Sequence, residues 1–92
     1  MPLVFVQRYA PLVAQAVGTQ YVDGPLVIEG TFTVTLDAAV YNAPGLYILI
    51  DYTNGSIATP SQVSNIVLNP PAGRSVVSGP TVSGKTIVFQ LS

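Results

Sequence analysis

The run from Gly79 to Thr86 has the spacing of a phosphate-binding loop, G-x-x-x-x-G-K-[ST]. In nucleotide-binding proteins such a loop leaves a parallel strand and opens a helix, whose first backbone N–H groups bind the phosphates. Here the residues after Thr86 read Ile-Val-Phe-Gln-Leu-Ser, which is typical of a strand. We therefore expect a glycine-containing hairpin turn, and the sequence predicts neither a nucleotide nor any other cofactor.

Carboxylates are the other groups with chemical potential, and the chain has four: Asp23, Glu29, Asp37 and Asp51. Acid–base catalysis needs two such groups held together, and no spacing here forces any pair into contact. The chain also contains no His and no Cys, which removes the commonest general base and the preferred zinc ligands. We expect Asp37 to cap or turn a strand end. Asp51 is expected to end its strand and pair with Arg74 or Lys85. The sequence predicts no catalytic or metal-binding residue and therefore no enzyme; a calcium site built from loop oxygens at a subunit interface is the metal alternative.

Three tyrosines lie close together in the sequence around a Pro44-Gly45 turn: Tyr41, Tyr47 and Tyr52. Amide and carboxylate side chains follow nearby, and aromatic faces beside such groups suit either a protein partner or a glycan. Ordinary packing of strand tyrosines is the third interpretation. The sequence leaves these three open.

Charge is scarce in this chain: three Lys or Arg and four Asp or Glu among 92 residues, with 49% apolar residues and a net charge of −1. Globular domains are usually about a quarter charged, and a small net charge favours association. Three basic residues balanced by four acidic ones exclude the basic footprint that nucleic-acid binding requires. No stretch has the length and apolarity of a membrane span, and the N-terminus lacks the pattern of a signal peptide.

Alternation with a period of two predicts strands along most of the chain. From Leu26 to Leu36 apolar residues alternate with Thr and Glu, which predicts one half-buried strand with a bulge or bend at Gly30. The segment Leu46 to Tyr52 is apolar on both faces, so it is expected to be buried from two sides. A hairpin is expected at Thr53 to Ser56. Two further strands are predicted for residues 63–68 and 85–91, and a weak one for residues 74–78.

These elements favour an all-β fold, a small antiparallel β-sandwich or barrel with an extended N-terminal arm. We divide the chain into residues 1–22, an arm, edge strand or short helix, and residues 23–92, the sandwich or barrel domain. No repeat of 20–50 residues is evident, which argues against a complete solenoid.

The second half of the chain, residues 44–92, resembles a recurring stretch of bacterial β-solenoid surface passengers of the autotransporter type. In both, a strand of the form G-x-Y-x-L-[IVL]-x-Y is followed by a Pro-Ala-Gly turn and a terminal alternating strand. The match is carried by Gly45, Tyr47, Leu49, Ile50, Tyr52 and Gly55. The resemblance implies an all-β surface protein and no catalytic activity.

Together these features predict a structural subunit of a multimeric particle. The best fit is a virion protein assembled in the host cytoplasm, such as a bacteriophage capsid decoration protein bound to a major capsid protein. We expect a homo-oligomer, with a trimer favoured, and no membrane or nucleic-acid partner. The alternative is a glycan- or receptor-binding β-module of a phage fibre or a cell-surface adhesin. The predicted interface residues are Leu3, Val4, Phe5, Val6, Tyr41, Tyr47, Leu49 and Tyr52.

Overall fold

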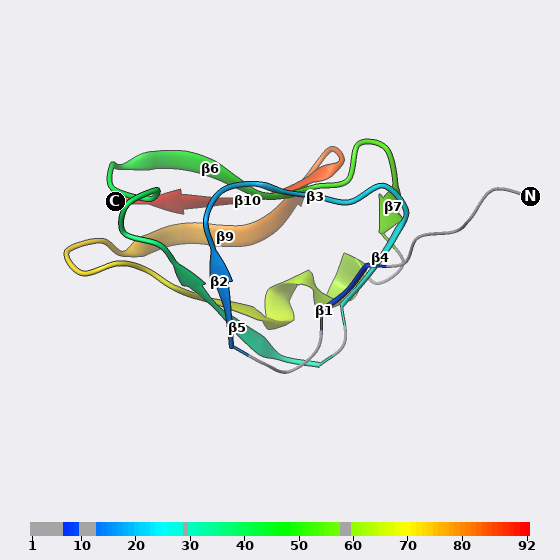
Figure 1. Cartoon of the computed structure of the whole chain (residues 1–92), viewed down its shortest axis with the longest axis horizontal. Helices are drawn as coiled ribbons and strands as arrows, with labels where there is room; N and C mark the ends of the chain where they lie inside the picture. Colours follow the sequence, from blue (N-terminus) through cyan, green and yellow to red (C-terminus); the bar gives the residue numbers. More distant parts are fainter. Residues whose placement is uncertain (1–6, 10–12, 29, 58–59) are drawn as a thin grey trace, which may run out of the picture.

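The computed structural model of the chain describes residues 7–9, 13–28, 30–57 and 60–92. Its elements are strands, apart from the 3-10 helix η1 (Pro60–Asn65). Ten strands follow one another as β1 (Gln7–Tyr9), β2 (Val13–Ala16), β3 (Gln20–Tyr21), β4 (Pro25–Ile28), β5 (Phe32–Leu36), β6 (Gly45–Asp51), β7 (Ser56–Ile57), β8 (Ile66–Asn69), β9 (Val76–Ser83) and β10 (Thr86–Leu91). The expected all-β class is confirmed (Figure 1).

The strands form three sheets, and consecutive strands pass from one sheet to the next. The orders are β1-β4-β7, β2-β5-β8 and β3-β6-β10-β9. In the first two sheets every pair is parallel, as is β3 with β6. The chain therefore winds as a short three-sided coil, which we divide into a first coil (β1–β3), a second coil (β4–β6) and a third coil (β7, η1, β8 and β9).

The antiparallel arrangement expected from the sequence holds only in part of the four-stranded sheet. Strand β10 runs antiparallel to both β6 and β9 and lies between them. This strand interrupts the parallel stacking where a further coil would otherwise pair with β6. The β9–β10 hairpin thus ends the winding at the C-terminal end, in the manner of a capping repeat.

The expected strand from Leu26 to Leu36 is two strands, β4 and β5, which lie in different sheets. Gly30 stands between them at φ +69°, a conformation that glycine adopts without steric cost, so the expected bend there is a corner of the coil. The alternation survives the corner, because Leu26 and Ile28 before it and Val34 and Leu36 after it are all buried.

The predicted hairpin at Thr53 to Ser56 is also a coil corner, because β7 pairs with β4 rather than with β6. Two corners are stacked here: the amide of Ser56 donates to the Gly24 carbonyl at 3.2 Å. A Cβ on Gly55 would lie 2.3 Å from that same carbonyl oxygen. Only glycine at position 55 allows the second corner to approach the first this closely.

The argument against a solenoid was wrong for the strand arrangement, because the coils differ in length. Gln7 pairs with Leu26 and Val13 with Thr33, which are offsets of 19 and 20 residues. In the next coil the offsets are 31 and 34, from Pro25 to Ser56 and from Phe32 to Ile66. No single repeat length therefore runs through the sequence, although the strands stack.

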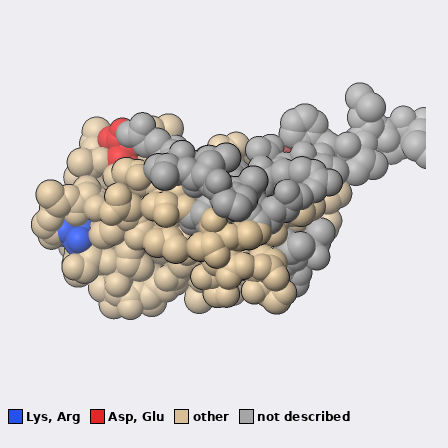
Figure 2. Space-filling view, turned by 90° about the horizontal axis from the view of Figure 1, so that it is seen from below, with Lys and Arg blue, Asp and Glu red and all other residues tan. Residues whose placement is uncertain are grey.

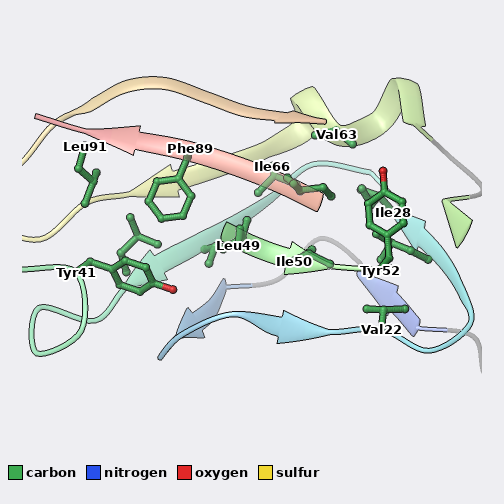
Figure 3. Close-up of a cluster of buried hydrophobic side chains, with 14 residues drawn as sticks. Val22, Ile28, Tyr41, Leu49, Ile50, Tyr52, Val63, Ile66, Phe89 and Leu91 are labelled. Atoms are coloured by element: carbon green, nitrogen blue, oxygen red, sulfur yellow. The ribbon is translucent and has the colours of Figure 1, made fainter. Parts of the chain in front are cut away.

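One hydrophobic core fills the space between the three sheets (Figure 3). Its buried side chains come from all three sheets and the helix: Val22, Leu26, Ile28, Val34, Leu36, Tyr41, Leu49, Ile50, Tyr52, Val63, Ile66, Ile87, Phe89 and Leu91. Strand β10 supplies Ile87, Phe89 and Leu91, the alternate positions that its sequence pattern predicts. Of the residues 1–22, those that the structure describes as strands, β1–β3, each lie at the edge of a sheet.

Candidate interaction surface

The phosphate-loop spacing from Gly79 to Thr86 lies on the β9–β10 hairpin, as its sequence context predicts. Gly84 occupies the turn at φ +60°, and the Thr86 hydroxyl donates to the Ser83 carbonyl at 2.6 Å. The Lys85 ammonium donates to the Gly55 carbonyl at 2.8 Å, so it ties the hairpin to a coil corner. Strand β10 follows directly, and no helix presents its N–H groups to a phosphate at this run.

The carboxylates of the described residues shape turns. The Asp37 carboxylate accepts from the Ala39 amide at 2.7 Å, while its backbone carbonyl accepts from Val40 and Tyr41. This confirms the expected turn at the end of β5. Within the described part of the chain no three His, Cys, Asp or Glu side chains gather as a metal site would require. Glu29 lies outside the described residues.

Asp51 ends β6 as expected, but its partner is not the basic residue that the sequence suggested. Its carboxylate accepts from the Thr53 hydroxyl at 2.6 Å and from the Thr53 amide at 2.9 Å. These two hydrogen bonds hold the pKa of the Asp51 carboxyl below its usual range. Arg74 instead donates to the carbonyls of Asn42 and Ser92, at 2.9 and 3.0 Å.

Tyr41 lies in the core and is 1% exposed. Its ring contacts Tyr47 edge-on, with centroids 5.0 Å apart, and Phe89 at 5.6 Å; Tyr47 also stacks on Phe89 at 5.6 Å. The Tyr41 hydroxyl accepts from the Gly18 amide at 3.2 Å. Burial raises the pKa of Tyr41 above its usual value, with a smaller opposing effect of the Gly18 hydrogen bond. This aromatic cluster of Tyr41, Tyr47 and Phe89 is a packing feature.

Three of the predicted interface residues are therefore core residues: Tyr41, Leu49 and Tyr52, which are 1%, 4% and 2% exposed. They do not offer surface to a partner, and the packing interpretation applies to them. Tyr52 donates its hydroxyl to the Gly84 carbonyl at 3.4 Å, and its burial raises its pKa. Tyr47 is partly buried and donates to the Ala43 carbonyl at 2.7 Å. The remaining predicted positions, Leu3, Val4, Phe5 and Val6, lie outside the described residues.

The expectation that both faces of Leu46 to Tyr52 are buried holds only for the inner face. Leu46 is 68% exposed and Ile48 is 41% exposed. In register, Ile48 pairs with Val88, and Val88 pairs with Thr81 of β9; Leu46 pairs with Gln90. Paired residues share one side of a sheet. We call this side of β6, β10 and β9 the outer sheet face, and these paired positions carry no charged residue.

Much of the surface is equally poor in charge. Figure 2 shows a face in which uncharged residues predominate, with one blue patch and one red patch toward the same end of the molecule. The exposed large apolar side chains are Val17, Tyr21, Val40, Leu46, Ile48, Val67, Val77 and Val82. Most of them belong to the four-stranded sheet or to the segment that leads into it. On the outer sheet face, Leu46 and Ile48 are neighbours on one side of β6, which makes them the candidate interaction surface.

Sequence reasoning missed the exposed residues of the first coil, above all Val17 and Tyr21. A weak signal was present. Asp23-Gly24-Pro25-Leu26 and Asn54-Gly55-Ser56-Ile57 share the form [DN]-G-x-[LI], and the register pairs Pro25 with Ser56 and Leu26 with Ile57. This four-residue repeat marks equivalent corners and could have identified Gln20–Tyr21 as the strand that precedes such a corner, by analogy with β6.

Comparison with protein-family models, with curated proteins and with solved structures found no match to this chain. Among the described residues, no helix has the length and apolarity needed to span a membrane. The exposed outer sheet face and the order of the strands are therefore the features that bear on function.

Proposed function

We propose that this chain is a structural subunit of a multimeric particle, which associates with copies of itself and with a larger protein scaffold. The observation that carries the proposal is the exposed apolar part of the outer sheet face at Leu46 and Ile48; the register places Asp51, paired with Thr86, at the other end of the same side of β6. Burying apolar area contributes about 25 cal/mol per Å², and docking over Leu46 and Ile48 alone covers no ionic group and so loses no charge hydration. A subunit that stays in contact with its neighbours can be held in the particle by apolar burial alone.

A bacteriophage virion is the particle that we propose, with the chain as a decoration protein on the shell. The outer sheet face would then lie on the scaffold. Repetition of one small contact over many symmetry-related sites supplies the stability that a single contact of this size lacks.

The experiment compares the full chain with the double variant Leu46→Lys, Ile48→Lys in the cells that make it. We expect the wild-type chain to sediment with large particles and the double variant to remain in the light fractions. Val67→Lys, an exposed position on a different sheet, is the matched control and should sediment as the wild type does. A wild-type chain found only in light fractions would contradict the proposal.

The alternative is a glycan-binding module of a surface fibre or adhesin. The parallel winding of the strands favours this alternative, because such winding agrees with the resemblance to β-solenoid surface passengers. Its candidate residue is Tyr21, which is 69% exposed and pairs in register with Asp51. A glycan array distinguishes the two functions: selective binding that Tyr21→Ala abolishes would support the module and oppose the structural subunit.

A further inference from the structure

The three sheets place all the strands of the first coil at their edges. Strands β1, β2 and β3 are each the first member of the sheet order, and among the described residues each pairs on one side only, with β4, β5 and β6. An edge strand presents unpaired backbone N–H and C=O groups along its free side and is a template for pairing with another chain. The first-coil edge therefore exposes three such templates at one end of the molecule.

The opposite end carries devices that prevent strand addition. Strand β7 has two residues, and β8 is followed directly by Pro70 and Pro71. Strand β9, the edge of the four-stranded sheet, contains Pro80, and its pairing with β10 shifts register near Gln90. Short edges, proline and bulges are the means by which β-proteins protect their edges.

The first-coil edge shares the short strands, since β3 has two residues as β7 does, but its described strands have neither proline nor a bulge. The residues Gln7–Tyr9, Val13–Ala16 and Gln20–Tyr21 include no proline, and their pairing with the second coil shows no register shift. Two of the most exposed apolar side chains belong to the same coil: Val17 at 67% and Tyr21 at 69%. Backbone groups that lack a partner and apolar surface thus coincide here.

We propose that the first-coil edge binds the same edge of a second copy, so that two molecules join head to head. The inference rests on the proposed function, a subunit that associates with itself. It commits to a second copy because Arg8 is the one charged residue in these edge strands. Pairing the edge with the same edge of another copy therefore brings few like charges together. It commits to head-to-head contact because the C-terminal edge of the four-stranded sheet, β9, contains Pro80 and pairs with β10 through register shifts, so it offers no regular edge to a head-to-tail partner.

A head-to-head contact is isologous and closes after two copies. The expected product is thus a dimer of the 9.6 kDa chain rather than a fibre. The trimer that the sequence favoured would require a different surface. The outer sheet face remains free in the dimer for the scaffold.

The test measures the mass of the purified full chain by light scattering and sedimentation over a wide range of concentrations. We expect the wild type to be a dimer, and the double variant Val17→Lys, Tyr21→Lys to dissociate about a hundredfold more readily, since four added charges would face one another across the join. Both positions are exposed, so the circular dichroism of the variant should stay that of the wild type. The matched control, Val77→Lys, adds a charge at an equally exposed position of β9 and should leave the dimer intact.

A second measurement does not depend on charge. The chain has no Cys, so a single Val17→Cys substitution allows a short bifunctional maleimide to link two copies, whereas Val77→Cys should give no linked pair. If the wild type associates but the Val17 and Tyr21 variants associate equally well, or if it forms fibres or trimers, the head-to-head join is wrong and the proposed function stands. A chain that stays monomeric at every concentration and is found only in the light fractions overturns both.

Discussion

The two ends of the coil stack are built on different principles. At the C-terminal end, an antiparallel strand enters the sheet, and prolines stand in or after the edge strands. At the N-terminal end, three strands pair in unbroken parallel register and their coil leaves Val17 and Tyr21 exposed. This chain therefore covers its sheet edge at one end with its own C-terminal hairpin, and at the other end it leaves apolar side chains exposed.

Burial follows the same division. Strand β10 contributes Ile87, Phe89 and Leu91, each 1% exposed or less, and Phe89 joins the aromatic cluster with Tyr41 and Tyr47. Among the described residues of the first coil and the turn after it, Val22 is the buried member of the core, with Ala16 packed against it. The free energy of unfolding should therefore depend strongly on the C-terminal hairpin and weakly on the first coil.

The largest expected effect comes from Phe89→Ala. Removing a fully buried aromatic ring leaves a cavity beside Tyr41 and Tyr47, and we expect the free energy of unfolding to fall by about 3–5 kcal/mol. Tyr21→Ala, at the exposed end, should change it by no more than about 0.5 kcal/mol. Urea denaturation followed by circular dichroism, at a protein concentration low enough to keep each variant monomeric, measures both. Equal losses at the two positions would remove the distinction between the ends.

The next effect tests how tightly the first coil is stacked on the second. Gly55→Ala places a methyl group 2.3 Å from the Gly24 carbonyl oxygen, so one corner must move, and we expect a loss of about 3 kcal/mol. Gly84→Ala is the matched control, because its Cβ meets nothing within 4 Å and only its positive φ resists the substitution. That strain costs about 1 kcal/mol. The same urea titration compares them, and a Gly55→Ala loss no larger than that of Gly84→Ala would show that the corners are loosely packed.

Strands and their inward sides could be predicted from the sequence, because alternation fixes which residues face the core. This worked for Ile87, Phe89 and Leu91 and, on either side of Gly30, for Ile28 and Val34. Alternation cannot distinguish a parallel from an antiparallel partner, since the side-chain period is two in both. The corner at Gly30 and the unequal coils then made a winding chain look like a succession of hairpins.

The candidate surface was harder to predict for a related reason. A strand that is apolar on both sides, such as β6, is predicted to be buried on both sides, yet the single chain covers only its inner side. Tyr41 and Tyr52 were expected near a partner because tyrosine is common at interfaces, but the structure satisfies both hydroxyls within the chain. The scarcity of charged residues in the sequence predicted exposed apolar surface, but the strand order was needed to locate it.

The smallest expected effect concerns the corner beside the last strand of the first coil. Asp51 pairs with Tyr21, its backbone carbonyl accepts from the Val22 amide, and its carboxylate accepts two hydrogen bonds from Thr53. Because these bonds lower the pKa of Asp51 in the folded chain, the ionised form stabilises the fold at pH values above the unfolded pKa of about 3.9. That contribution is lost as the pH falls through the lower, folded pKa.

Thr53→Val removes one of the two hydrogen bonds, so the variant should unfold at a slightly lower urea concentration than the wild type at pH 7. The urea midpoints of the variant and the wild type should converge in acid, below the folded pKa. Asp23→Asn, a charge loss on the exposed turn that follows β3, is the control for a general effect of charge. A difference between wild type and Thr53→Val that persists unchanged in acid would mean that the hydroxyl acts through packing and not through its hydrogen bond to the ionised Asp51 carboxylate.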